Sequence, residues 1–194
     1  MSQFFLRSPR LGFRTWRESD LPLALRLWGD AAVTRLIARR GFSEAEVRAR
    51  LEREIATHAA HRIQYWPIFL VADTEPAGEE PASGDFVGCC GLRPRAGEPE
   101  VPELGVHIAS AHWRRGYAFE AASCVIQYAF EVLGFRALFA GHNPENAASR
   151  ALLGRLGFVH THDEVYEPTG LVHPSYRLTR PSPSVSGGGS PASC

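Results

Sequence analysis

The sequence predicts an α/β fold in which strands and helices follow one another within a single domain. Segments with the period of two that is typical of strands alternate with segments of helical period, and Gly, Pro, Asn and Asp residues separate them. The chain has 194 residues, of which 44% are hydrophobic, and this is enough for one substantial core. The segment that follows Gly116 is apolar over most of a helical circumference, which predicts a central, buried helix.

The first third of the chain predicts one strand followed by two helices. RLGFRTW, residues 10–16, alternates polar and apolar side chains as a strand does. Residues 18–22, ESDLP, are typical of a helix entry and lead into LALRLWGD. Ser43, followed by Glu46, forms a capping-box pattern, which predicts a second, exposed helix over residues 43–61.

The middle of the chain predicts three strands. Two β-rich segments, residues 65–73 and 85–94, flank a Gly/Pro/Glu loop and are expected to pair as a hairpin. VPELGVHIAS, residues 101–110, is the next strand. Its alternation places Glu103, Gly105 and His107 on one face, so a carboxylate and an imidazole share that face.

The last third predicts a strand, a helix and a closing pair of strands. RALFAGH, residues 136–142, is the strand, and Asn143 with Pro144 predicts a helix start with Asn as the N-cap. Gly157 is expected to end that helix in a left-handed conformation. Residues 158–166 and 171–178 then pair at the end of the sheet.

Composition narrows the classes of function. Lys+Arg and Asp+Glu both number 21, so the formal net charge is zero, which disfavours nucleic-acid binding and a polybasic membrane anchor. Every cation is an arginine, because the sequence contains no lysine, and arginine favours bidentate contacts with phosphate or carboxylate. The cysteines, Cys89, Cys90, Cys124 and Cys194, fit no paired-metal spacing, and adjacent cysteines are poor candidates for a structural disulfide.

Two further expectations concern location and domain limits. No run approaches the roughly 20 apolar residues of a membrane span, and the cysteine pattern suits a reducing compartment, so we expect a cytoplasmic protein. Residues 1–180 are expected to form the domain. Residues 181–194, PSPSVSGGGSPASC, are Ser/Gly/Pro-rich without apolar periodicity and predict a flexible tail.

The segment HWRRGYAFEA, residues 112–121, suggests an anion site. A helix start exposes unpaired backbone N–H groups and the positive end of the helix dipole, so a small-residue turn beside two arginines suits a phosphate. An ordinary turn with a solvated basic edge explains the same ten residues, so the surrounding sequence decides between the two interpretations.

Residues 102–158, from PELGVHIAS to RLGF, resemble the core of the GNAT superfamily of acetyl-CoA-dependent N-acetyltransferases. The similarity is greatest to its RimJ/RimL-like branch, which SPRLGFRTWRESDL at the start of the chain also resembles. The resemblance covers roughly residues 8–180. It implies the GNAT fold, a mixed and mostly antiparallel sheet of six to seven strands flanked by about four helices. It also implies acetyl-CoA as the cosubstrate, no metal, and acetyl transfer to a primary amine by direct attack.

The resemblance assigns cofactor contacts to two segments. Backbone amides of Arg114, Arg115, Gly116, Tyr117 and Ala118, with the arginine side chains, would hold the pyrophosphate of coenzyme A. Val106, with its neighbours His107 and Ile108, would border the cofactor where the strand leaves its neighbour, and a backbone N–H there would hold the oxyanion.

The resemblance also assigns the catalytic roles. Glu103 matches the strand carboxylate that often serves as base in this family, although a solvent-facing strand carboxylate is the alternative. Leu153 stands where the wider superfamily has a tyrosine acid, and Ser149 matches the serine of the RimJ/RimL-like branch. Asn143 and Asn146 match residues that contact the pantetheine arm, and helix capping is the competing role of Asn143.

Several features keep two interpretations. His160 and His162 are expected on one strand face, as a metal pair or, more simply, as surface residues. Arg39 and Arg40 lie where the family places loops that contact the acceptor, and His107 and His142 are further candidates for the acceptor pocket. The resemblance implies that the acceptor is a protein N-terminal amine or a small amine. We expect the protein to be a monomer or a homodimer. An antibiotic-modifying acetyltransferase and a non-catalytic acyl-CoA-binding module are the alternatives.

Overall fold

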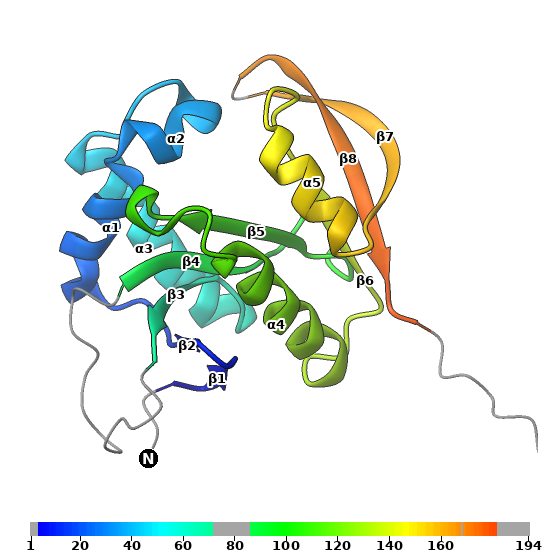
Figure 1. Cartoon of the computed structure of the whole chain (residues 1–194), viewed down its shortest axis with the longest axis horizontal. Helices are drawn as coiled ribbons and strands as arrows, with labels where there is room; N and C mark the ends of the chain where they lie inside the picture. The colour runs from blue at the N-terminus through cyan, green and yellow to red at the C-terminus, as the bar shows by residue number, and fades with distance from the viewer. Residues whose placement is uncertain (1–3, 72–85, 168, 182–194) are drawn as a thin grey trace, which may run out of the picture.

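The computed structural model describes residues 4–71, 86–167 and 169–181, which form one sheet of eight strands in the order β1-β2-β3-β4-β5-β6-β8-β7 (Figure 1). The strands are β1 (Leu6–Arg7), β2 (Leu11–Phe13), β3 (Tyr65–Leu70), β4 (Phe86–Arg93), β5 (Glu103–Ile108), β6 (Ala137–Gly141), β7 (Val159–Tyr166) and β8 (Leu171–Thr179). Neighbouring strands run antiparallel except β5 and β6, which are parallel. The expected mixed, mostly antiparallel sheet is confirmed, with eight strands instead of six to seven.

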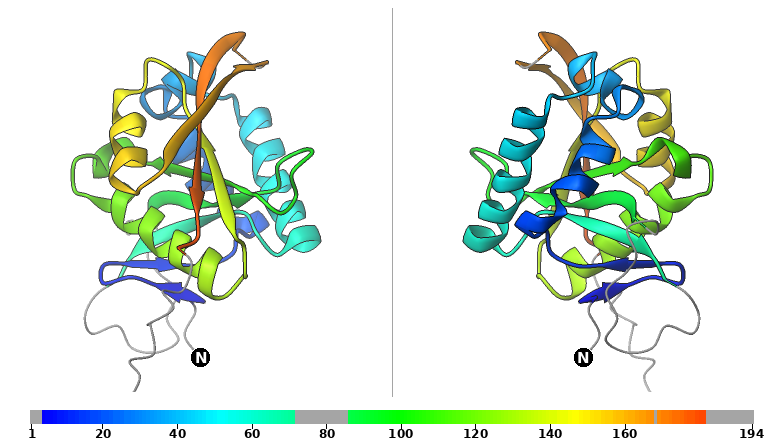
Figure 2. Two further views of the ribbon diagram at one scale, coloured as in Figure 1. Left: turned by 90° about the vertical axis from the view of Figure 1, so that its right-hand side faces the viewer. Right: turned by 90° about the vertical axis from the view of Figure 1, so that its left-hand side faces the viewer.

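Helices cover both faces of the sheet. They are α1 (Leu21–Trp28), α2 (Ala31–Ala38), α3 (Glu44–His61), α4 (Tyr117–Glu131) and α5 (Ala147–Arg155), with 3-10 turns at Glu18–Asp20 and Ser110–His112. Figure 2 shows α3 on one side of the sheet and α4 with α5 on the other. Among the described helices, none is both long and apolar enough to cross a membrane.

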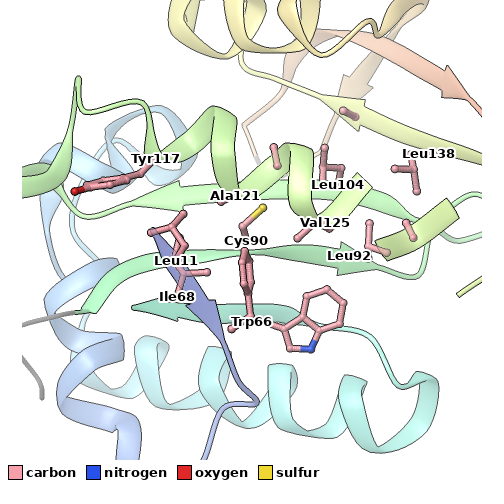
Figure 3. Packing of buried hydrophobic residues seen from close by; sticks show 14 of the residues in the cluster. Leu11, Trp66, Ile68, Cys90, Leu92, Leu104, Tyr117, Ala121, Val125 and Leu138 are labelled. Carbon is pink, nitrogen blue, oxygen red and sulfur yellow. The ribbon is translucent and has the colours of Figure 1, made fainter. Parts of the chain in front are cut away.

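Each helical layer has its own hydrophobic core. On the α4 side, strand residues such as Leu11, Trp66 and Leu104 pack against Ala121 and Val125 of α4 (Figure 3). This confirms the prediction that the helix after Gly116 is buried. A second cluster lies between the sheet and helices α1 and α3. The two cores leave β5 in the middle of the sheet with a helical layer on either side.

The first strand is shorter than predicted and ends at Phe13. Beyond Phe13, the side chains of Arg14 and Trp16 make the hydrogen bonds that hold the segment in place. The buried Arg14 guanidinium donates to both carboxylate oxygens of Asp20, each at 2.7 Å. The indole N–H of Trp16 donates to the Tyr65 carbonyl at 2.6 Å. The added strand, β1, pairs with β2 through Leu6 and Phe13, so the predicted strand is one arm of a short hairpin.

Helix α2 lies where no helix was predicted, which explains why the described chain has five helices instead of about four. Asp30 caps it, since the Asp30 side chain accepts from the backbone N–H of Ala32 at 2.8 Å. The predicted capping box of Ser43 and Glu46 is confirmed at the start of α3. The prediction that α3 is exposed is wrong for one face, which buries Val47 and Leu51.

Helix α5 begins three residues later than predicted. The N-cap is Asn146, whose side chain accepts from the backbone N–H of Ser149 at 3.0 Å. Asn143 instead forms a turn, in which its side chain accepts from the N–H of Glu145 at 2.9 Å and its carbonyl from the N–H of Asn146 at 2.8 Å. Asn side chains form such turns readily and thereby compete with the helix. Gly157 ends the helix with φ +84°, as predicted.

The two closing strands pair as predicted, but β8 lies inside the sheet and β7 at its edge. A β-bulge at Thr161 pairs His160 with Tyr176 and His162 with Ser175. Because adjacent residues of β8 face opposite sides, the two histidines lie on opposite faces, and the prediction of one shared face is wrong. The flexible tail predicted for residues 181–194 lies outside the described residues from 182 onward.

Candidate active site

Strands β5 and β6 separate immediately after they begin. β5 pairs with β4 at six positions, from Arg93 with Glu103 to Gly88 with Ile108, but with β6 only where Glu103 meets Phe139. A parallel pair joined at one position diverges beyond it. The gap opens on the β6 edge of residues 104–108, in the centre of the sheet.

The backbone of β5 points free donors into this gap. The Ala109 N–H bonds to the β4 carbonyl of Val87 at 2.9 Å, and the Pro102 carbonyl accepts from the β6 N–H of Phe139 at 3.0 Å. Successive strand residues direct their backbone groups to opposite edges, so the N–H groups of the even-numbered residues, Val106 and Ile108 among them, face β6. The Val106 and Ile108 N–H groups lie past the last β5–β6 pair and have no backbone acceptor among the described residues, so they can bind a ligand atom.

The turn between β5 and α4 exposes a row of backbone donors. Arg114 has φ +61° and Gly116 has φ +82°, and the first α4 bond runs from the Glu120 N–H to the Gly116 carbonyl at 3.1 Å. The backbone N–H groups of residues 114–119 find no acceptor among the described residues. Trp113 fixes the turn to β5, because its indole N–H donates to the Ile108 carbonyl at 2.8 Å. The Arg114 and Arg115 side chains are exposed beside these donors.

An arginine that the sequence analysis missed also lies at this turn. Arg10, between β1 and β2, donates through Nε to Glu120 of α4 at 2.6 Å and through Nη1 to the Arg115 carbonyl at 3.1 Å. The Ser8 hydroxyl donates to the same carboxylate at 2.7 Å. Partial burial favours a higher pKa for Glu120, but these hydrogen bonds outweigh it and lower the pKa. No local pattern predicts a contact between residues about 110 positions apart.

Glu103 lies at the start of the gap and is partly buried on the sheet face that carries α1 and α3. Burial raises its pKa, and the nearby Arg93 and Arg95 guanidinium groups offset this only in part. A carboxyl group with a raised pKa is a better proton acceptor than an exposed one. Its environment therefore suits a base, but the side chain is also partly exposed, so the base and the solvent-facing strand carboxylate both stay predictions.

His107 and Tyr65 lie beside Glu103 on the same face. The indole N–H of Trp28 donates to Nδ1 of His107 at 3.1 Å. Burial, reinforced by the charges of Arg50 and Arg93, holds the His107 pKa well below its ordinary value, so the ring is neutral. The Tyr65 ring meets His107 edge to face at 5.9 Å and packs directly on Gly105, where a Cβ atom would overlap its phenol group.

The residues expected on α5 lie on the α4 side of the sheet. Leu153 is buried with the α4 cluster, and Arg155 stacks on the Phe119 ring of α4 at 4.3 Å. Ser149, one turn before Leu153, is partly exposed. Ser149 and the α4 turn are therefore on one face of the sheet, and Glu103 and His107 are on the other.

A pocket of about 320 Å³ lies between α2, the loop after β6 and the turn between β7 and β8. Its lining residues are Arg35, Leu36, Ile37, Arg39, Asn143, Glu145 and Thr169. The Asn143 amide donates to the Leu36 carbonyl at 3.1 Å and joins two of these segments. Arg39 lines this pocket, and its contact with an acceptor stays a prediction, whereas Arg40 pairs with Glu46 at 2.6 Å.

The remaining histidine candidates have protein partners. His142 is buried and stacks on Tyr176 at 5.4 Å. His160 contacts Asp163 at 2.7 Å. In the described ranges of the chain, no three His, Cys, Asp or Glu side chains gather into a group that could hold a metal ion.

Comparisons with known proteins give one consistent result. A profile of the acetyltransferase (GNAT) domain matches residues 10–159. A Bacillus licheniformis protein named "Uncharacterized N-acetyltransferase p20" is 26% identical over 157 residues, which cover 79% of this chain and 81% of the relative. YkkB of Bacillus subtilis is 36% identical over 80 residues, 41% of this chain, and the match spans only 46% of YkkB.

Solved structures share the fold. A GNAT-family acetyltransferase from Bacillus anthracis superposes with a TM-score of 0.73 at 20% identity, over 91% of this chain and 98% of that one. RimL, a ribosomal L7/L12 alpha-N-protein acetyltransferase in complex with coenzyme A, gives a TM-score of 0.70 at 14% identity, over 89% of this chain and 95% of RimL.

Proposed function

The chain belongs to the GNAT acetyltransferase family, and from this membership we propose that it is an acetyl-CoA-dependent N-acetyltransferase of the RimJ/RimL-like type, acting on a primary amine. One observation carries the proposal. β5 and β6 part in the centre of the sheet, and the strand that lines the gap leads directly into a turn of unpaired N–H groups. An elongated cosubstrate with a pyrophosphate at one end and a thioester at the other fits that arrangement.

The turn suits the pyrophosphate of coenzyme A. Its unpaired amides point outward at the positive end of the α4 dipole, which favours an anion. A Cβ atom added at Gly116 would meet only the Arg10 Nη2 atom, at 3.5 Å, so the backbone is open to close approach. Arg114 and Arg115 add exposed guanidinium groups to the same turn. The residues present therefore fit the group.

The two faces of the sheet divide the chemistry. Acetyl-CoA, when bound, supplies the activated acetyl group. Glu103, on the face of α1 and α3, takes a proton from the acceptor ammonium, directly or through water. The N–H groups of Val106 and Ile108, which face the gap, donate to the oxygen that becomes negative during attack. Ser149, on the opposite face, passes its hydroxyl proton to the departing sulfur as it takes another from water, and Leu153 leaves no alternative acid one turn along.

The acceptor is a protein N-terminal amine or a small amine, and it enters from the side of α2. Arg39 and Glu145, which line the pocket there, lie at that entrance. An antibiotic that carries an amine would be acetylated by the same chemistry, and only the group that fills the pocket beside α2 would be different. A non-catalytic acyl-CoA-binding module would keep the turn and would not need a carboxyl group with a raised pKa beside the gap.

Thiol release from acetyl-CoA tests the proposal, with a panel of small amines, aminoglycosides and N-terminal peptides. With the best acceptor, Glu103→Gln should lower turnover about 10²- to 10⁴-fold and keep coenzyme A binding. Glu100→Gln, an exposed carboxylate three residues earlier, is the matched control and should change little. The rising limb of the wild-type pH profile should lie above pH 4.5, because the Glu103 pKa is raised, and should move or vanish in the variant.

Two outcomes would contradict the assignment. Wild-type turnover in Glu103→Gln would make Glu103 a strand carboxylate and remove it from the mechanism. Coenzyme A binding without turnover of any acceptor would favour the non-catalytic module.

A further inference from the structure

One arginine inside the layer of α1 and α3, Arg50, makes no salt bridge with any described residue. Arg50 lies on the face of α3 that buries Val47 and Leu51, and its own side chain is partly buried. Its guanidinium lies over the Trp28 ring at 5.1 Å and near the Phe42 ring at 5.5 Å. The Nε atom is buried and has no hydrogen-bond partner. Within the described residues, no carboxylate pairs with it.

Both glutamates one turn away on α3 are engaged elsewhere. Glu46 and Glu54 occupy the i−4 and i+4 positions, which are the usual partners of a helical arginine. Glu46 accepts hydrogen bonds from Nη1 and Nη2 of Arg40, at 2.8 and 2.6 Å. The buried Glu54 accepts the Tyr65 backbone N–H at 2.9 Å and pairs with Arg93. Among the described residues, none therefore forms a salt bridge with Arg50 or accepts a hydrogen bond from its Nε.

Arg50 lies on the acceptor side of the proposed reaction centre. The Trp28 ring under Arg50 donates its N–H to His107 of β5 at 3.1 Å. Glu103, Gly105 and His107 face this layer and remain partly exposed although β5 is an inner strand, so the helices do not seal this part of the sheet. Arg50 is also close enough to Glu103 for its charge to act on that carboxyl group.

A partly buried cation without a partner costs free energy, because it loses water and gains no anion. We propose that Arg50 binds a carboxylate of the amine acceptor, so that the preferred acceptors are amines that carry an anionic group close to the reacting nitrogen. The stacked guanidinium is held in place for a bidentate contact. This inference rests on the proposed acetyl transfer and adds the class of acceptor.

The carboxylate has two sources, the α-carboxylate of a free amino acid or an acidic side chain near a peptide N-terminus. The test compares four proteins, wild type, Arg50→Met, Arg50→Lys and Arg53→Met. Arg53 is the matched control, an exposed arginine on the same helix. The acceptors come in pairs, the standard amino acids against their α-carboxamides, and Ser-Asp peptides against Ser-Asn peptides. Each pair differs only by the charge of one group.

Arg50→Met should lower kcat/KM about 10- to 100-fold for the carboxylate member of the preferred pair and much less for the neutral member, because a charged hydrogen-bonded contact is lost. Arg50→Lys should recover part of the loss, and Arg53→Met should behave as wild type. Thermal stability of Arg50→Met should change little, because the substitution removes an unpaired charge but also removes the packing of the guanidinium on the Trp28 and Phe42 rings. An equal loss of kcat/KM with both members of a pair would overturn the proposal. So would a wild type that prefers neutral acceptors.

A wild type without turnover would refute the acetyl-transfer proposal and would still allow a decision on Arg50. The same acceptors are then compared by thermal shift with coenzyme A bound. Carboxylates that stabilise wild type but not Arg50→Met would support the anion site. Equal shifts in both proteins, or no shift with any carboxylate, would exclude it.

Discussion

Replacement of Gly116 by valine should have two measurable effects, a lower melting temperature from backbone strain and a weaker stabilisation by coenzyme A. Gly116 has φ +82°, where a residue with a side chain costs roughly 1–2 kcal/mol. For a chain of this length, each kcal/mol lowers the melting temperature by about 2–4 °C, so we expect a fall of about 2–8 °C. The added side chain has room, since the nearest atom is Arg10 Nη2 at 3.5 Å, and it would occupy the side from which a phosphate approaches.

Gly134→Val is the matched control. Gly134 has φ +77° with no neighbour within 4 Å of its added Cβ atom, so the backbone cost is alike and the site lies after α4. Coenzyme A at a hundred times its dissociation constant should stabilise wild type and Gly134→Val by about 2.7 kcal/mol. A tenfold weaker affinity in Gly116→Val would reduce that by about 1.4 kcal/mol, or about 3–6 °C in differential scanning fluorimetry. Equal coenzyme A shifts in both variants would refute the assignment of the turn.

Three further changes test other parts of the site by thermal unfolding. Because the pKa of Glu103 is raised, the folded state binds its proton more tightly than the unfolded state, so the free energy of unfolding falls as pH rises from 4.5 through the folded pKa. Glu103→Gln should therefore be at least as stable as wild type at pH 7.5, and a large loss of stability would contradict the burial of this carboxyl group. Gly105→Ala should cost about 1–3 kcal/mol, because its methyl group overlaps the Tyr65 phenol, and an unchanged melting temperature would show that Tyr65 moves freely. Asn146→Ala should cost about 1 kcal/mol even without coenzyme A, since it removes the cap on the Ser149 N–H, and no loss would leave Asn146 free for a cofactor role.

The sequence predicted features that depend on nearby residues. The capping box at Ser43 and the left-handed Gly157 follow from local backbone preferences, and both were confirmed. The start of α5 was misplaced because Asn143 and Asn146 are equally good caps, and only the turn between them decides. Helix α2 was missed although Asp30 marked its start, since its eight residues are too few for a clear period.

Features that depend on pairing across the chain could not be predicted. The contact of Arg10 with Glu120 joins residues brought together by the sheet, and no spacing in the sequence signals it. Arg50 lacks a salt bridge because Glu46 pairs with Arg40 and Glu54 pairs with Arg93. From the sequence alone, the spacing of four residues would have paired Arg50 with one of these two glutamates. The gap beside Val106 arises from backbone groups, which every residue carries, so only the family resemblance pointed to it.

The position of β8 between β6 and β7 has a consequence for biosynthesis. β6 meets β5 at a single pair of residues, so its main partner is β8, a strand that is synthesised after α5. A nascent chain that has reached α5 already contains Glu103, Gly116 and Ser149 but leaves both edges of β6 nearly bare, and bare edges invite association with other chains. Until Leu171–Thr179 joins the sheet, the β6 wall of the gap lacks its main partner, so the site is completed only after β8 has been made.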